Sequence, residues 1–432
     1  MKMRKEKLAI KGGKRAVQKV QGDMFKWPII TKEDENAVLE VLRAGKMSET
    51  DVTMKFEKEY AGWHKIKYAL GFNTGTAALH SAMWACRVGV GDEIIGPSLT
   101  YWASVLPALN LGATVIFAEV KPETLCIDPD DIEHRITKRT KAIIPVHYCG
   151  YPCDMDKIMK IARIYKIKVI EDVSHAHGGL YKGRVLGTIG DTGCFSIMSG
   201  KALPCGEGGM LTTNNREIYE RAVAFGHYER TSQTRYSKTQ GLTIPQLKKF
   251  AGLPWGGFKY RMHQLTSAVG RVQLKHYRKR MKEIQKAMNY FWDLLEGVKG
   301  IRAHRPAKNS GSTMGGWYAP HGIYVPEELG NLPIKKFCEA VQAEGSVCSS
   351  GTNFPLHLHP LFHEADIYHH GRPTIIANTK RDVRQKKGSL PVTESIPARA
   401  FSIPWFKHYR KDIIKEHAYA FCKVAENYKQ LL

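Results

Sequence analysis

The chain has 432 residues, enough for two domains and a large hydrophobic core. Its 43% hydrophobic residues and only 20 prolines are typical of a globular protein and exclude a disordered one. The formal net charge is +24, but the basic residues are spread over the whole length, without a basic stripe or a nucleic-acid motif. We therefore expect a basic surface suited to a phosphorylated ligand and no nucleic-acid partner.

No apolar run approaches the roughly 18 residues that a membrane span needs. The basic start, residues 1–17, lacks the apolar segment of a secretory signal. The nine cysteines are scattered and odd in number, which is typical of reduced thiols, and Cys149 and Cys153 have no second pair at zinc-site spacing. We expect a cytoplasmic protein with neither a metal site nor a membrane partner.

The first element that indicates a ligand is a helix start within residues 71–83, GFNTGTAALHSAM. It follows the strand-like YAL, so Asn73, Thr74, Gly75 and Thr76 stand at the helix N-terminus. Free backbone amides and the helix dipole favour an anion such as phosphate there. Ordinary helix capping would give the same pattern, and the motif alone leaves both interpretations open.

Near-continuous apolar runs of strand length come next, as in parallel strands that are buried on both faces. Between two of them, residues 154–166 repeat apolar side chains at helical spacing, with Asp154 as the N-cap. This βαβ pattern predicts an α/β domain with a mostly parallel sheet flanked by helices. The predicted strands are Thr114–Val120, Lys141–Tyr148, Ile167–Val173 and Cys194–Met198.

Two acidic residues, Glu171 and Asp172, end one of these strands in IEDVSHAHGG. Doubly wound sheets bind their ligands at the carboxyl ends of strands. A carboxylate there could meet a helix dipole or an arginine, or it could hold the proton on a ligand nitrogen. His175 could contact the same ligand or be an ordinary loop histidine.

One lysine, Lys201, stands between an apolar run and a glycine-rich turn with Gly206, Gly208 and Gly209. The glycines let backbone approach a neighbour closely. Burial lowers the pKa of a lysine and makes it a nucleophile that can form Schiff bases. The plainer interpretation is a lysine whose stem packs while its ammonium reaches water.

The second half of the chain has a different pattern. Residues 260–298 have one long helical pattern, which would connect the large domain to a smaller C-terminal α+β domain of short elements and many turns. We therefore expect an N-terminal arm at 1–30, a large cofactor-binding α/β domain at 31–265, and the linking helix with the small domain at 266–432.

Three histidines lie close together in FPLHLHPLFH, residues 354–363. If this segment were a strand, His357 and His359 would share one face. Their spacing with His363 fits no standard zinc site, so we expect a role in a substrate pocket or in the structure rather than a metal site.

The helix start, Asp172 and Lys201 together match the needs of one cofactor, pyridoxal phosphate. Its phosphate needs amides and hydroxyls, and its aldehyde needs a lysine. Its pyridine nitrogen needs an anion to stay protonated. The plain interpretation of Lys201 therefore becomes the weaker one.

The chain also resembles the DegT/DnrJ/EryC1/StrS family of sugar aminotransferases, of the fold type I pyridoxal-phosphate class. The resemblance covers nearly the whole chain and is most specific where Ser196, Lys201 and the Gly-Glu-Gly-Gly patch fall at the family's spacing. The motifs that carry it are LAIKGG, NTGTAAL, PVHYCGYPCDMD, EDVSHAHGG, FSIMSGKALPCGEGGML, YRMHQLTSAVGRVQL, PLHLHPLF and LPVTESIPARAFSIPWF.

The resemblance implies a role for each residue that matches a family motif. Lys201 would be the Schiff-base lysine, and Asp172 would pair with the pyridine nitrogen. Tyr101 would stack on the cofactor, and His175 would lie near its ring hydroxyl. The residues that would bind its phosphate are Gly75, Thr76 and Ser196.

Two departures from the family pattern are visible in the sequence. Lys259, in GGFKYRM, stands where the family usually has an asparagine that reaches the neighbouring subunit's cofactor phosphate in a homodimer. An ammonium can bind phosphate as a point charge. Tyr148 and Cys149 stand where an aliphatic and an aromatic residue are usual in the pocket wall.

The implied reaction is a two-step transamination within amino-sugar or aminocyclitol biosynthesis. Glutamate or glutamine would give up its amino group, and a keto-sugar or keto-cyclitol would receive it, with Lys201 moving the protons. One alternative is a keto-sugar dehydratase of the same family, which has histidine at the lysine position. The other is a non-catalytic binding or regulatory protein on this fold. The presence of Lys201, Asp172 and Ser196 argues against both.

Overall fold

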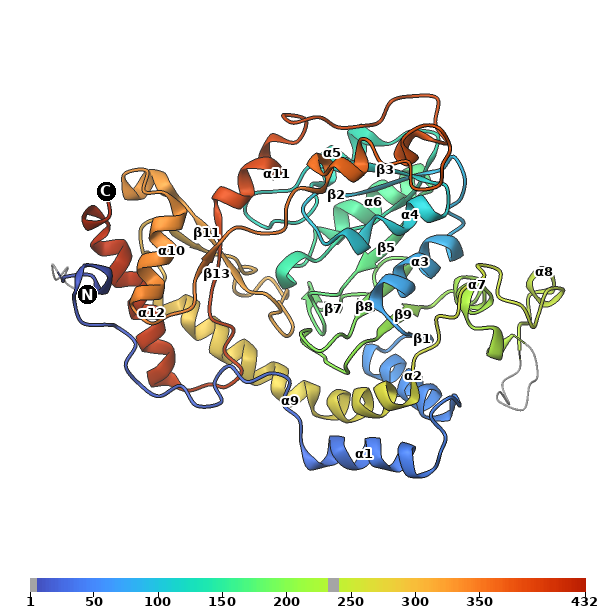
Figure 1. Ribbon diagram of the computed structural model, residues 1–432, viewed down its shortest axis with the longest axis horizontal. Helices are drawn as coiled ribbons and strands as arrows, with labels where there is room; N and C mark the ends of the chain where they lie inside the picture. Colours follow the sequence, from blue (N-terminus) through green and yellow to red (C-terminus); the bar gives the residue numbers. More distant parts are fainter. Residues whose placement is uncertain (1–5, 232–240) are drawn as a thin grey trace.

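The computed structural model describes residues 6–231 and 241–432 of the chain. Its largest element is a seven-stranded sheet (Figure 1). Strands β2, β3, β4, β5 and β8 pair in parallel, whereas β9 is antiparallel to both of its neighbours. This confirms the expected mostly parallel sheet. In spatial order the strands are β1 (Tyr68–Phe72), β9 (Gly209–Thr213), β8 (Thr192–Ser196), β5 (Lys168–Asp172), β4 (Thr140–Ile143), β2 (Glu93–Pro97) and β3 (Thr114–Ala118).

The four strands predicted from apolar runs correspond to β3, β4, β5 and β8. The apolar pattern continues past the strand ends because the following loops are buried too. After β4, for example, Val146 makes only an isolated bridge to Asp172. The predicted helix is α6 (Met155–Tyr165), and the Asp154 carboxylate accepts a hydrogen bond from the Lys157 amide at 3.3 Å, as an N-cap does.

Helices flank this sheet and pack on its strands. Helix α3 runs beside β8 and β9, α6 beside β5, and α2 beside β1, while α1 packs on α9 at the outside of the molecule (Figure 1). The helices of this part are α1 (Lys32–Arg43), α2 (Asp51–His64), α3 (Gly75–Ala85), α4 (Pro107–Asn110), α5 (Pro129–Arg135), α6, α7 (Arg216–Gly226) and α8 (Pro245–Lys248), with the short hairpin β6 (Leu180–Tyr181) and β7 (Arg184–Val185).

A second, smaller sheet of four antiparallel strands lies at the other end of the molecule (Figure 1). Helices α10 (Ile334–Ala343) and α12 (Lys411–Glu426) lie in the same part of the fold. The expected small α+β domain is therefore present. Its strands, in spatial order, are β10 (Ile301–Ala303), β11 (His321–Tyr324), β13 (Ala400–Ser402) and β12 (Ser349–Ser350).

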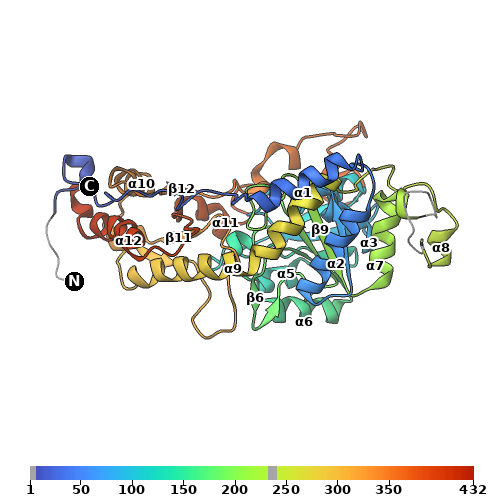
Figure 2. The ribbon, with the colours of Figure 1, turned by 90° about the horizontal axis from the view of Figure 1, so that it is seen from below.

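The long helix α9 (Gln264–Leu294) runs from the large sheet to the small one (Figure 2). Its Leu274 and Tyr277 belong to the hydrophobic core of the large sheet. Its Phe291 and Trp292 belong to the separate core of the small domain. One continuous helix thus holds the two parts together.

Residues 356–396 return from the small domain to the large sheet and cover its outer strand β3. The Gln385 carboxamide bonds both the amide and the carbonyl of Phe117, at 2.8 and 2.9 Å. Phe362 and Leu390, near the short helix α11 (Pro391–Ser395), are buried in the large core. The edge of the sheet is thereby protected. The predicted domain boundaries at residues 30 and 265 stay a proposal. Residues 356–396, which this prediction gives to the small domain, pack on the large sheet. Residues 1–5 of the predicted N-terminal arm lie outside the described residues.

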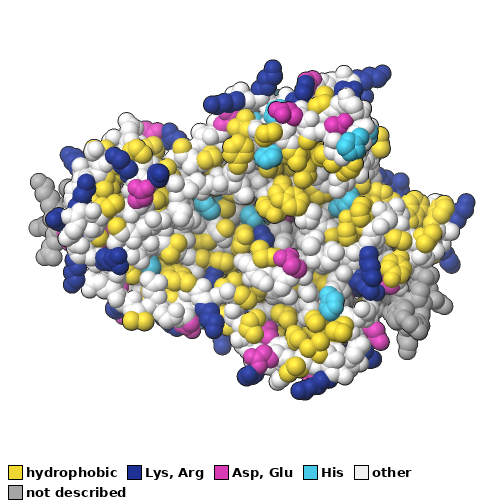
Figure 3. Space-filling model, viewed as in Figure 1, with side chains coloured by type: hydrophobic (Ala, Val, Ile, Leu, Met, Phe, Trp, Pro, Cys, Tyr) yellow, Lys and Arg dark blue, Asp and Glu magenta, His cyan; other side chains and the backbone are white. Residues whose placement is uncertain are grey.

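On the face shown in Figure 3, the Lys and Arg side chains are scattered around the molecule and do not form one continuous stripe. Such an arrangement is typical of a solvated basic surface. Within residues 6–231 and 241–432, no helix is both long enough and apolar enough to cross a membrane.

Candidate active site

A cavity of about 660 Å³ opens at the carboxyl ends of the large-sheet strands, where the small domain meets them. The large sheet supplies its floor, and residues 318–321 and 350–353 supply a second wall. Lys259 does not line this cavity. The residues expected to bind or act on the cofactor that do line it are Gly75, Thr76, Tyr101, Asp172, His175, Ser196 and Lys201.

One side of the cavity is the N-terminus of α3. Thr74 caps this helix, its hydroxyl accepting a hydrogen bond from the Ala77 amide at 3.0 Å. A Cβ on Gly75 would lie 2.7 Å from the Cβ of Ser196, so only glycine lets the helix approach the end of β8 so closely. The first amides of α3 and the hydroxyls of Thr76 and Ser196 therefore border the same cavity, a donor set suited to phosphate.

The Asp172 carboxylate at the end of β5 is held on both oxygens. Ser104 donates its hydroxyl to Oδ2 at 2.7 Å, and the Ser174 amide donates to Oδ1 at 3.1 Å. The Thr100 hydroxyl lies 2.8 Å from that of Ser104 and extends the chain of hydroxyls. Asp172 is 4% exposed, so its carboxylate has a fixed direction at the cavity.

The neighbouring acid, Glu171, points to the other side of the sheet, as side chains alternate along a strand. It accepts hydrogen bonds from the amides of Gly187, Ile189 and Gly190 at 2.7–2.9 Å. His147 Nε2 lies 3.1 Å from it and, with these amides, keeps the pKa of Glu171 below its usual range despite burial. Of the two adjacent acids, Asp172 is thus the one that faces the cavity.

Lys201 reaches the cavity from the loop after β8 and is 8% exposed. Burial lowers its pKa to about 8, and the nearby Asp172 opposes that shift. At neutral pH both the ammonium and the free amine are therefore accessible. The Lys201 carbonyl accepts a hydrogen bond from Trp27 Nε1 at 2.9 Å, which ties the N-terminal arm to this loop.

His175 lies beside the same cavity. Its Nδ1 accepts a hydrogen bond from the Cys149 amide at 3.2 Å, so the proton of the neutral ring is on Nε2. Burial and the neighbouring Lys201 lower the pKa of His175 well below its usual value. The ring is therefore neutral and can donate one hydrogen bond.

The two departures in the pocket wall lie at the cavity as well. The Tyr148 hydroxyl donates to Asn353 Oδ1 at 2.7 Å and accepts from the Asn353 amide at 3.2 Å, which joins the large sheet to the small domain. Cys149 has a left-handed backbone with φ of 50°. Its thiol lies 3.3 Å from His321 Nδ1, and burial raises its pKa.

Tyr101 and Lys259 lie in different settings. The Tyr101 ring, 51% exposed, borders the cavity beside Trp102. Lys259 is exposed on the segment whose Tyr260 carbonyl accepts a hydrogen bond from the Asn73 amide, close to the start of α3. The structure therefore gathers every predicted site residue except Lys259 around one cavity.

The histidines of residues 354–363 do not form a strand, so that premise was wrong. His357 lies in a 3₁₀-helix, Leu356–Leu358, whose prolines at either side prevent ladder pairing. Its ring lies between the Ser98 hydroxyl, at 2.7 Å, and the Glu394 carboxylate, at 3.0 Å, which is a structural role. Among the described residues, no group of three or more His, Cys, Asp or Glu side chains is placed to hold a metal ion.

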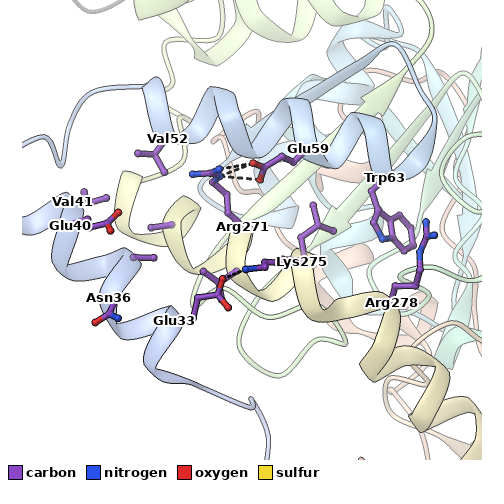
Figure 4. A pocket seen from close by; sticks show the side chains of 14 residues that line it. Glu33, Asn36, Glu40, Val41, Val52, Glu59, Trp63, Arg271, Lys275 and Arg278 are labelled. Carbon is purple, nitrogen blue, oxygen red and sulfur yellow. Dashed lines mark hydrogen bonds and ion pairs between the residues drawn. The ribbon is translucent and has the colours of Figure 1, made fainter.

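A larger cavity, of about 1010 Å³, lies between α1, α2 and α9 (Figure 4). Four of its charged side chains form ion pairs: Arg271 contacts Glu59 at 2.6 Å, and Lys275 contacts Glu33. No residue predicted to bind or act on a ligand lines it. We therefore assign the chemistry to the smaller cavity.

Sequence reasoning missed several residues that line the site or support it: Thr100, Ser104, Ser174, Tyr318, His321 and Asn353. Ser104 and Thr100 flank Tyr101 in the chain, so their closeness to a candidate residue was a weak signal. The small-domain residues had no signal because only the tertiary fold brings them to the cavity.

The residues around the cavity fit pyridoxal phosphate. The close approach of α3 to Ser196 at Gly75, called the Gly75 cradle below, offers amides and hydroxyls for the phosphate. The hydrogen-bonded Asp172 carboxylate suits the ring nitrogen, and the buried Lys201 suits the aldehyde. With the mixed seven-stranded sheet, they define a fold type I pyridoxal-phosphate enzyme. A sequence model described as the DegT/DnrJ/EryC1/StrS aminotransferase family matches residues 28–418. The chain belongs to this family and is a pyridoxal-phosphate-dependent aminotransferase.

Individual relatives agree with this assignment. An uncharacterised protein of Methanocaldococcus jannaschii is 33% identical over 93% of this chain and 97% of its own. GDP-perosamine synthase of Escherichia coli O157:H7 is 37% identical over 57% of this chain and 64% of its own. The crystal structure of S. venezuelae DesV in complex with a ketimine intermediate, 27% identical, covers 91% of this chain and 94% of its own with a TM-score of 0.74. The expected enzyme class and cofactor are confirmed.

Proposed function

We propose that this enzyme transfers an amino group from glutamate or glutamine to the carbonyl carbon of a nucleotide-linked keto-sugar, in amino-sugar biosynthesis. The observation that carries the proposal is the cavity that holds both Lys201 and Asp172 in a chain related to GDP-perosamine synthase. A keto-cyclitol is the other acceptor class that the sequence resemblance implies.

The residues around the cavity have distinct binding roles in this proposal. The amides at the start of α3, with the hydroxyls of Thr76 and Ser196, bind the cofactor phosphate. Asp172 holds the proton of the pyridine nitrogen, and the hydrogen bonds from Ser104 and Ser174 keep its carboxylate in place. The remaining contacts are the Tyr101 ring on the cofactor face and the His175 Nε2 proton toward the ring hydroxyl.

Lys201 moves the protons of both half-reactions. When bound, pyridoxal phosphate supplies the electron sink that makes the α-carbon of the donor acidic. The neutral Lys201 amine accepts the proton from that carbon. As an ammonium, Lys201 then delivers this proton to the carbon that was the aldehyde of the cofactor. With the acceptor, Lys201 moves the proton in the opposite direction. A pKa near 8 suits a group that must do both.

The wall of the cavity from the small domain supports a sugar as the acceptor. Ser350, Thr352 and Asn353 line it with hydroxyl and carboxamide groups. Burial lowers the pKa of His321, so its ring is neutral. Neutral donors and acceptors suit the hydroxyl groups of a sugar ring.

We further propose that the enzyme is a homodimer whose sites are completed by the second copy. Phe250, Leu253 and Trp255 are 50%, 75% and 44% exposed, and Lys259 follows them on the same segment. Large exposed apolar side chains close together are typical of an interface. With these side chains buried against a second copy, we propose that Lys259 reaches the partner's cofactor phosphate, as the family resemblance implies.

The proposed compartment is the cytoplasm. All nine cysteines are unpaired, and eight of them are buried. Free thiols in this number suit a reducing compartment.

The test of the acceptor runs the reaction backwards. The holoenzyme is incubated with 2-oxoglutarate or 2-oxoglutaramate, the keto acids of the two donors, and with GDP-perosamine, dTDP-linked amino sugars or an amino-cyclitol. Glutamate and glutamine are measured by mass spectrometry. We expect one of these two amino acids with at least one nucleotide-linked amino sugar and neither with the Lys201→Ala variant. Formation of glutamate or glutamine from the amino-cyclitol alone would overturn the keto-sugar proposal while leaving the aminotransferase class intact.

A further inference from the structure

Tyr318 lies against the amino group of Lys201, although the two belong to different parts of the fold. Tyr318 lies near the end of the loop of residues 304–320, which leaves the small domain after β10 and returns to β11. The Lys201 Nζ lies 4.0 Å from the centroid of the Tyr318 ring, and both residues line the cavity. An ammonium within about 6 Å of an aromatic face is attracted by the ring.

The backbone around Tyr318 is strained on both sides. Trp317 and Ala319 have left-handed φ angles of 56° and 47°, which residues with a Cβ rarely adopt. Such strain persists only where the surrounding structure imposes it, and it gathers at functional sites. Contacts with other parts of the fold must therefore impose the backbone conformation of this loop.

Close packing imposes this geometry. The Gly316 amide donates to the His177 carbonyl at 3.1 Å, and Trp405 Nε1 donates to the Gly316 carbonyl at 3.0 Å. A Cβ on Gly316 would lie 2.4 Å from the Cβ of Ala202, the residue after Lys201. The loop is thus pressed against the lysine segment itself.

Ring contacts fix the orientation of the Tyr318 side chain. Trp405 packs against it edge-on with centroids 5.8 Å apart, and the His175 ring contacts it at a tilt of 50° with centroids 4.7 Å apart. The Lys201 Nζ lies over the same ring, 4.0 Å from its centroid, together with these two neighbouring rings.

The surroundings of Lys201 contain groups that favour its neutral amine and groups that favour its ammonium form. Burial favours the neutral amine, and Asp172 favours the ammonium. The face of the Tyr318 ring adds to the ammonium side. The titratable groups that act on Lys201 are Asp172, Cys149, His175 and His177.

We propose that Tyr318 is a further catalytic residue of this enzyme, whose ring face holds the amino group of Lys201 whenever that amine is free. The ring keeps the amine at the cavity between proton transfers and stabilises its protonated form. The hydroxyl of Tyr318 is not needed for this role. The inference rests on the proposed role of Lys201 and does not depend on which acceptor the enzyme uses.

The test follows the attachment of pyridoxal phosphate to full-length protein freed of cofactor, by visible absorbance, from about pH 6 to about pH 10. The rate should rise with pH as the amine loses its proton, with a wild-type midpoint near 8. Tyr318→Leu removes the ring face and should lower the midpoint by about 0.5 to 1 pH unit. Tyr318→Phe keeps the ring and should keep the midpoint.

Each other outcome contradicts the proposal. An unchanged midpoint in Tyr318→Leu would show that the ring does not act on the amine, and an equal shift in Tyr318→Phe would assign the effect to the hydroxyl. If Tyr318→Leu does not fold, Tyr318→Trp replaces it, and a midpoint below that of the wild type would overturn the proposal. Lys201→Ala should lose the pH-dependent absorbance, and its failure to do so would refute the role of Lys201 instead.

Discussion

At the scale of single residues, two glycines set the shape of the cofactor site. Gly75 opens α3 against Ser196, where a Cβ would approach to 2.7 Å, and Gly209 opens β9 against the Thr74 carbonyl, where a Cβ would approach to 2.3 Å. The two contacts interlock the end of β8, the start of β9 and the start of α3. The amides that would bind phosphate are therefore positioned by the absence of two side chains.

Substituting Gly75 should accordingly weaken cofactor binding. Gly75→Ala forces α3 away from Ser196, and we expect the Kd for pyridoxal phosphate to rise about 10- to 100-fold, the effect of a steric clash in a packed site. The control is Gly62→Ala in α2, where a Cβ meets nothing within 4 Å. Titration of both variants by absorbance checks this. Equal affinities of the two variants for pyridoxal phosphate would refute the role of the Gly75 cradle in cofactor binding.

At the scale of elements, the buried parallel strands and α6 could be predicted because their patterns are local. An apolar run of strand length and a capped amphipathic helix depend only on neighbouring residues. The 3₁₀-helix at Leu356–Leu358 could not be predicted this way. Its alternation of apolar residues and histidines resembles a strand, whereas the flanking prolines prevent strand pairing and the contacts of His357 with Ser98 and Glu394 hold the segment in place.

The candidate site divides in the same way. Lys201 and Asp172 could be predicted from the sequence because charged residues are rarely found beside a buried strand. Tyr318 could not be predicted, because no local sequence pattern distinguishes a site tyrosine from any other tyrosine in a loop. Its position at the cavity depends on the return of residues 304–320 to the large sheet. Lys259 follows from the resemblance alone, and its proposed contact lies in a second subunit that one chain does not contain.

At the scale of the whole molecule, α9 joins two hydrophobic cores and the small domain supplies one wall of the cavity. The proposed dimer would supply the last contact, since Lys259 is exposed and lies off the cavity of its own chain. Each site would then combine a large sheet, a small domain and a segment of the partner.

This arrangement predicts complementation between two inactive variants. Lys201→Ala and Lys259→Glu, each of which we expect to be defective alone, are co-expressed so that mixed dimers form. A mixed dimer has one site with both substitutions and one with neither, so we expect about a quarter of the wild-type activity in the donor half-reaction. Activity no higher than the sum of the separate variants would show that Lys259 does not act across a dimer.

We propose that this chain accepts an amino group through Lys201 and a bound pyridoxal phosphate. The most direct measurement is the visible absorbance of the holoenzyme as glutamate and then glutamine is added, with assay of the keto acid and with Lys201→Ala alongside. We predict that the band of the bound cofactor falls with one of these donors as keto acid forms, and that the variant shows neither change. A wild-type band that no amino donor alters, or a variant that reacts as fast as the wild type, would contradict this role of Lys201.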